Sequence, residues 1–94
     1  MSALTNNTAG NRNTASGFQA LYSNTTAGNN AAFGYQALYY NTTGSYNTAV
    51  GMQALWQNIT ANYNTASGFG ALYLNTTGSS NSALGMQALY NNRW

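Results

Sequence analysis

The 94-residue chain contains no cysteine, proline, histidine, lysine, aspartate or glutamate, and its two charged residues are Arg12 and Arg93. Without histidine or carboxylate side chains, no ordinary general acid or base is available. The side chains that hold metal ions in conventional sites are missing too. The many hydroxyl groups have no basic side chain to activate them. We therefore expect a protein that is not an enzyme and that uses neither a metal ion nor another cofactor.

The low charge also excludes two kinds of partner. The formal net charge is +2, and two arginines near opposite ends cannot follow a phosphate backbone, so we expect no nucleic acid partner. No apolar run approaches the length that crosses a bilayer, so we expect no membrane insertion. The absence of cysteine excludes a disulfide framework and leaves the redox compartment open.

What the chain does have is a repeat of 17 residues that runs from Asn13 to the end without insertion or deletion. The unit reads N-T-A-x-G-[FYM]-Q-A-L-[YW]-x-N-T-T-G-x-[NY], with small departures. Residues 1–12 form a partial or irregular first repeat, in which 2–12 resemble the tail of a preceding unit slipped by one residue. The five units that follow are 13–29, 30–46, 47–63, 64–80 and a truncated 81–94.

Aligning the units places one residue type at each equivalent position, and each such set is called a column. The glycine column is Gly17, Gly34, Gly51, Gly68 and Gly85. The leucine column is Leu21, Leu38, Leu55, Leu72 and Leu89. The aromatic column is Tyr22, Tyr39, Trp56, Tyr73 and Tyr90. The first asparagine column is Asn13, Asn30, Asn47, Asn64 and Asn81, and the second is Asn24, Asn41, Asn58, Asn75 and Asn92.

The constant repeat length favours a stacked architecture, because each residue of a solenoid lies above its counterpart in the neighbouring coil. Seventeen residues are too few for a helix pair, and glycine with N-T-T-G is a poor helix interior. We predict an all-β fold, a β-solenoid (β-roll) of about five coils, each with two or three short strands. The glycine column forms one corner, where positive φ or close backbone approach is required, and T-T-G-x-N forms a broader second corner.

The G-x-Q-A-L-Y segment leaves one ambiguity. Phe18, Leu21 and Tyr22 have a spacing that also suits a short helical turn. We prefer a strand, which would place Gln19 on the leucine side in a stacked amide ladder.

The N-T-A-V-G-M-Q-A segment (47–54) and its copies resemble the left-handed β-roll repeats of trimeric autotransporter adhesin heads. The longer N-T-A-V-G-x-Q-A-L-Y-x-N-T-T-G unit resembles repeat arrays of phage tail fibres and bacterial surface proteins. The resemblance covers nearly the whole chain. It implies stacked coils, association of three chains into a rigid shaft, and an extracellular, cell-surface or virion location.

Three columns offer binding or modification hypotheses. The aromatic column suits sugar faces, although packing within the coil or against a second chain is the preferred interpretation. N-x-T, the formal N-glycosylation acceptor, begins at Asn6, Asn24, Asn41, Asn58 and Asn75. Thr26, Thr43, Thr60 and Thr77 form a column that could bind ice as a threonine ladder, and turn chemistry is the alternative role.

We therefore expect a non-catalytic structural repeat protein that forms a rigid extracellular or virion fibre or filament by self-association. Its expected partner is itself, as a homotrimer or an end-to-end filament, because open solenoid ends are unpaired strand edges. The alternatives are a glycan-binding adhesin module that uses the aromatic column and an ice-binding protein that uses the threonine ladder. The missing charges fit stacking, since a charge in the unit would face its own copy in every coil.

Overall fold

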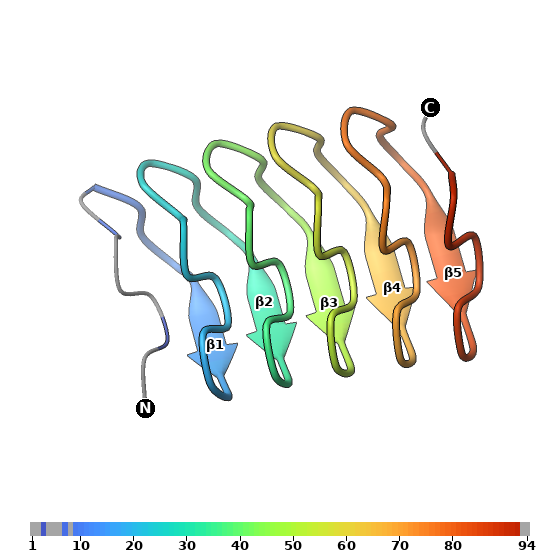
Figure 1. The fold of residues 1–94 in the computed structure, drawn as a ribbon. Helices are drawn as coiled ribbons and strands as arrows, with labels where there is room; N and C mark the ends of the chain where they lie inside the picture. Colours follow the sequence, from blue (N-terminus) through green and yellow to red (C-terminus); the bar gives the residue numbers. More distant parts are fainter. Residues whose placement is uncertain (1–2, 4–6, 8, 93–94) are drawn as a thin grey trace.

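The protein is an all-β parallel solenoid, seen in a computed structural model that describes Ala3, Asn7 and residues 9–92. One three-residue strand from each unit joins a single parallel sheet in the order β1-β2-β3-β4-β5. The strands are β1 Thr14–Ser16, β2 Ala31–Phe33, β3 Thr48–Val50, β4 Thr65–Ser67 and β5 Ser82–Leu84. Figure 1 shows the strands side by side in one row, with the two ends of the chain at opposite ends of the row.

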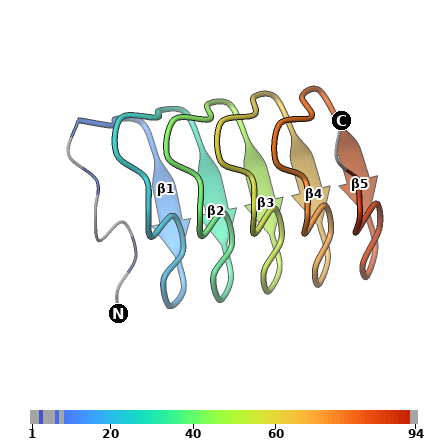
Figure 2. The ribbon, with the colours of Figure 1, turned by 45° about the horizontal axis from the view of Figure 1, so that its top comes forward.

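Paired residues in neighbouring strands of the sheet are 17 positions apart in sequence, which is the length of the repeat. Ala15 pairs with Ala32 and Ala32 with Ala49, so each strand residue lies beside its copy 17 residues on. The chain passes once around the solenoid axis in each unit and then continues into the next, and the turned view in Figure 2 shows the coils as a series of similar flattened loops. The predicted β-solenoid of 17-residue coils is therefore confirmed, with four full turns, from 13 to 80, and a fifth described to Asn92. The expectation of two or three strands in each coil is wrong for the described residues, where each coil has one strand.

Each strand ends at a tight corner made by the glycine column. The five glycines have φ between 118° and 131°. A Cβ added to Gly17 would lie 2.8 Å from the carbonyl carbon and oxygen of Gly34 in the next coil. The corner therefore requires glycine for two reasons, its positive φ and the close approach of the backbone in the next coil.

The segment after the corner is neither the strand that we preferred nor the helical turn. Gln19 and Leu21 have φ of 59° and 50°. One tight turn is closed by the Ala20 N–H on the Gly17 carbonyl, and another by the Asn24 N–H on the Leu21 carbonyl, both at 3.2 Å. Residues with positive φ interrupt a strand and a right-handed helix alike, so both predictions for this segment are wrong.

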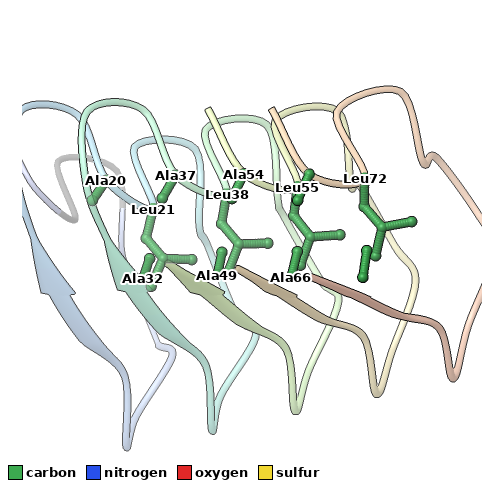
Figure 3. Close-up of a cluster of buried hydrophobic side chains, with 12 residues drawn as sticks. Ala20, Leu21, Ala32, Ala37, Leu38, Ala49, Ala54, Leu55, Ala66 and Leu72 are labelled. Atoms are coloured by element: carbon green, nitrogen blue, oxygen red, sulfur yellow. The ribbon is translucent and has the colours of Figure 1, made fainter. Parts of the chain in front are cut away.

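The core is a narrow column of small and medium side chains. Leucine and alanine fill it, with Ala20, Leu21, Ala32, Ala37 and Leu38 each fully buried. In Figure 3, Leu21 points toward Ala32 of the next coil, and Leu38 and Leu55 repeat the arrangement with Ala49 and Ala66. Burying a leucine side chain stabilises a fold by about 1.5–3 kcal/mol, so each added coil extends the core by one such contribution.

The first repeat keeps the register of the others in the part that the structure describes. The Asn24 Nδ2 donates to Asn7 Oδ1 at 2.7 Å, across the usual 17 residues. The Asn7 Nδ2 in turn donates to the Gly10 carbonyl at 3.0 Å, as Asn24 does to Ala27 at 3.1 Å. The slip of one residue that we expected is therefore wrong for Asn7 and Gly10.

Candidate interaction surfaces

The two asparagine columns form a buried amide network at the broad corner. In the second column, Asn58 is fully buried, and its Nδ2 donates to Asn41 Oδ1 at 3.0 Å and to the Ala61 carbonyl at 3.1 Å. In the first column, the Asn47 Nδ2 donates to the same Ala61 carbonyl at 2.8 Å, while its Oδ1 accepts the Asn64 backbone N–H at 2.9 Å. One amide therefore bonds along the solenoid and across the coil, which satisfies polar groups that would otherwise be costly to bury.

This network bears on the glycosylation hypothesis. Asn24, Asn41, Asn58 and Asn75 are fully buried. Both donor sites of their amide nitrogens are occupied by protein oxygens, for example the carbonyl of Gly44 at 2.9 Å and Asn24 Oδ1 at 3.2 Å for Asn41. The folded chain thus presents none of these four amides to a transferase, and attachment there would have to precede folding. Asn6 lies outside the described residues.

The amide ladder expected for the glutamines is present. Gln36 Nε2 donates to Gln19 Oε1 at 2.9 Å, and Gln53 Nε2 donates to Gln36 Oε1 at 3.0 Å. Gly70 occupies the next position and interrupts the ladder before Gln87. These amides are partly exposed, so they bond along the solenoid at its surface.

The aromatic column is a continuous stack of rings along the solenoid axis. Ring centroids lie 5.1 Å apart for Tyr22–Tyr39 and 4.8 Å apart for Trp56–Tyr73 and Tyr73–Tyr90, with planes within 8°. Between Tyr39 and Trp56 the spacing widens to 6.2 Å, and Tyr40 contacts both rings edge-on at 4.8 Å.

Because each ring covers the face of the next, the stack presents edges rather than faces to solvent. Sugar recognition by aromatic residues uses the ring face, whereas stacked pairs add about 0.5–1.5 kcal/mol each to the fold. This geometry supports packing as the role of the column. The Trp56 Nε1 is the one buried side-chain polar atom without a hydrogen-bond partner among the described residues.

Burial and ring contacts change the acidity of two tyrosines in this stack. Burial raises the pKa of Tyr39, and the neighbouring Tyr22, Tyr40 and Tyr35 raise it further because phenolates repel one another. Burial also raises the pKa of Tyr73, with a smaller contribution from Tyr90 and then Tyr40. The neutral form of these two phenols is therefore favoured in the folded chain.

The threonines do not form two parallel rows of exposed hydroxyl groups. Thr26, Thr43, Thr60 and Thr77 are exposed. The adjacent Thr42 turns its Oγ1 to the Ile59 carbonyl of the next coil at 3.3 Å, and Ile59 itself interrupts the neighbouring column. The ice-binding alternative therefore depends on one file of hydroxyl groups.

A further surface, which we did not predict, flanks the glycine corner. Of the thirteen exposed large hydrophobic side chains, eight come from the positions directly before and directly after the column glycine. We call these eight residues the apolar stripe: Phe18, Phe33, Tyr35, Val50, Met52, Phe69, Leu84 and Met86. Their residue types vary from unit to unit, so a search for invariant columns passes over them, whereas the recurrence of apolar types beside glycine was a usable signal.

The leucine column differs at the last described coil. Leu21, Leu38, Leu55 and Leu72 are fully buried, while Leu89 is 48% exposed. β5 pairs with β4 alone, whereas β2, β3 and β4 each pair on both sides. The face of this last coil therefore presents apolar core and an unpaired strand edge.

Among the residues that the structure describes there is no pocket and no group of three or more metal-binding side chains. The described part of the chain also contains no helix long and apolar enough to span a membrane. Comparison of the chain with protein-family models, with curated proteins and with solved structures returns no match.

Proposed function

We propose that this protein is a non-catalytic structural module, a stiff rod element of an extracellular or virion fibre that self-associates through the ends of its solenoid. The observation that carries the proposal is that the same contacts repeat from coil to coil along the axis, so any coil can be covered by a further coil in the same way. In the leucine column, Leu21, Leu38, Leu55 and Leu72 are fully buried by this stacking, and Leu89 in the last described coil is 48% exposed. A coil of a second copy stacked on this face would bury Leu89 as the fifth coil buries Leu72.

The backbone supports the same joint. The N–H at the first strand position donates to the carbonyl of the next coil, from Thr14 to Asn30 at 2.9 Å and from Thr65 to Asn81 at 2.8 Å. By this geometry, the Ser82 N–H points toward the open face of the last coil. Unpaired strand edges are templates for another chain, and the nearly uncharged surface adds little repulsion to oppose the contact.

The side-chain ladders account for stiffness. Backbone, asparagine, glutamine and aromatic ladders all run along the solenoid axis, so each coil is held by its two neighbours at several points of its perimeter. The alternative functions rest on weaker features, since the aromatic faces are covered and one file of threonines is exposed.

The test is the variant Ser82→Pro, which removes the end-facing N–H, with Ser82→Ala as a control that keeps it. Electron microscopy and sedimentation velocity should show fibres or long oligomers for the unmodified protein and for Ser82→Ala, and their loss in Ser82→Pro. A protein that sediments without end-to-end oligomers at every concentration, and shows no fibres, would contradict the proposal.

A further inference from the structure

The apolar stripe runs along the side of the solenoid and reaches the last described coil at Leu84 and Met86. Its eight side chains are 41% to 83% exposed. The two residues that flank a glycine have only that glycine between them, so their Cα atoms lie within about 7 Å and the two files form one band. In Figure 1 the turns that follow the strands line one long edge of the solenoid, so the band runs along the rod.

The stripe is large enough to bury in a stable interface. If the area of a fully exposed aromatic side chain, about 150–250 Å², is taken as the scale for all eight residues, their observed exposures correspond to roughly 600–1,000 Å². Typical monomers expose apolar patches of about 300–600 Å² at most, and a stable interface buries about 800 Å² per partner. The stripe also contains no charged residue, so two copies meet there without like-charge repulsion.

From this surface we infer that the solenoid pairs with a second copy of itself, stripe against stripe and antiparallel, about a two-fold axis that passes through the third coil. Such an axis brings the residue before each glycine opposite its equivalent in the other copy, with the coil order reversed. Coil one then faces coil five, coil two faces coil four, and coil three faces itself.

The sizes of the side chains fit this arrangement. In the file before the glycines, Ser16 meets Leu84, Phe33 meets Ser67, and Val50 meets Val50, so a small residue faces a large one or two medium residues meet. In the file after the glycines, the pairs are Phe18 with Met86, Tyr35 with Phe69, and Met52 with Met52. These are aromatic–methionine, aromatic–aromatic and methionine–methionine contacts, all of which pack well.

A parallel arrangement, whether a dimer or a trimer, packs the same residues poorly. It places each coil against the same coil of its partner, so in a dimer one layer would contain Phe33 and Tyr35 from both copies, four aromatic rings in all. Another layer would contain only Ser16 and Phe18 from both copies. Overfilled and underfilled layers both lower the stability of an interface that packs like a protein interior. The reversed order distributes the volume evenly among the layers.

The experiment uses single cysteine variants of the full chain, which has no cysteine of its own. Disulfides form where two Cα atoms come within about 7 Å. Under mild oxidation, Val50→Cys should cross-link to itself, whereas Phe33→Cys and Ser67→Cys, both away from the solenoid ends, should each stay unlinked alone and cross-link when mixed. Dimers in which every single variant links to itself, or in which the mixed pair fails to link, would refute the antiparallel pairing.

A charge variant tests the surface without disulfide chemistry. Val50→Lys places two ammonium groups against each other on the axis, and the dimer should weaken at least about a hundredfold in sedimentation equilibrium. Thr43→Lys adds the same charge at an exposed position of the broad corner and should leave the dimer intact. Both lysine variants are compared in the Ser82→Pro background, where stacking at the ends is blocked. A monomer at all concentrations for Ser82→Pro without a lysine, or equal weakening by both lysines, would overturn the side-by-side pairing and leave the stacking at the ends untouched.

Discussion

Gly17 and Gly85 occupy the same position of the repeat and have the same φ of 118°, but they differ in what lies beside them. A Cβ on Gly17 would lie 2.8 Å from two backbone atoms of Gly34, whereas a Cβ on Gly85 would meet nothing within 4 Å. Gly17 and Gly85 lie in the two outermost coils that contain a strand. Alanine at either position therefore imposes the same backbone strain, but only alanine at position 17 adds a steric clash.

The two contributions can be separated in magnitude. A φ of 118° costs an alanine about 1–3 kcal/mol, and this is the whole loss expected for Gly85→Ala. Gly17→Ala adds the cost of forcing two backbones apart, about 1–3 kcal/mol by analogy with overpacked cores. The expected total for Gly17→Ala is thus about 2–6 kcal/mol. The interior variant Gly51→Ala, whose Cβ would lie 2.7 Å from the Gly68 oxygen, should lose at least as much.

The assay is urea unfolding followed by far-ultraviolet circular dichroism, with thermal melts in parallel. For a chain of this size, 1 kcal/mol corresponds to a change of about 4–8 °C in Tm, so the difference between Gly17→Ala and Gly85→Ala should be plainly resolved. Equal losses for the two variants would show that positive φ alone explains the glycine column, and the reasoning from close coil contact would be refuted.

Three further predictions concern the ladders. Asn58→Asp buries a charge and should cost about 3–5 kcal/mol at pH 7; burial raises the pKa of the new carboxyl, so stability should recover as pH falls toward 3. Melts at both pH values check this against the partly exposed control Asn29→Asp, and equal behaviour of the two variants would contradict it. Gly70→Gln should restore the glutamine ladder and be about 1 kcal/mol more stable in urea than Gly70→Ala, which cannot bond but bears the same cost of a side chain at φ 64°; equal stability of the two variants would exclude a contribution from the ladder. Because the pKa values of Tyr39 and Tyr73 are raised above 10.0, their contribution is present below pH 10 and is lost as pH rises through the folded values. Absorbance at the phenolate band and circular dichroism should therefore change together, and ionisation of both rings without loss of structure would refute the coupling.

Much of the solenoid could be predicted because its neighbours in space are its copies in sequence. A stacked coil places Gly17 beside Gly34 and Gln19 beside Gln36, so the 17-residue period is also the sheet register and the ladder register. Local rules were then enough to assign the corner to glycine and the axial hydrogen bonds to amides.

The path of the chain within one coil was less accessible. A strand would place Ala20 and Leu21 on opposite faces, but positive φ at Leu21 lets both side chains enter the core, where each is fully buried. An αL leucine is locally unfavourable and is stabilised only by the burial that the closed coil provides. Residue preferences therefore led to a strand where the structure has two tight turns.

The sequence by itself determined the period, the register and the neutral, ladder-forming character of the columns, because translation along the solenoid axis brings identical positions together. Only the tertiary structure decided what each column faces. It buries the second asparagine column, covers the aromatic faces with neighbouring rings, and leaves the residues around the glycine corner exposed as the apolar stripe. The physical reason is that inward or outward direction depends on how 17 residues close around a core, and that closure arises from contacts across the coil rather than from the repeat.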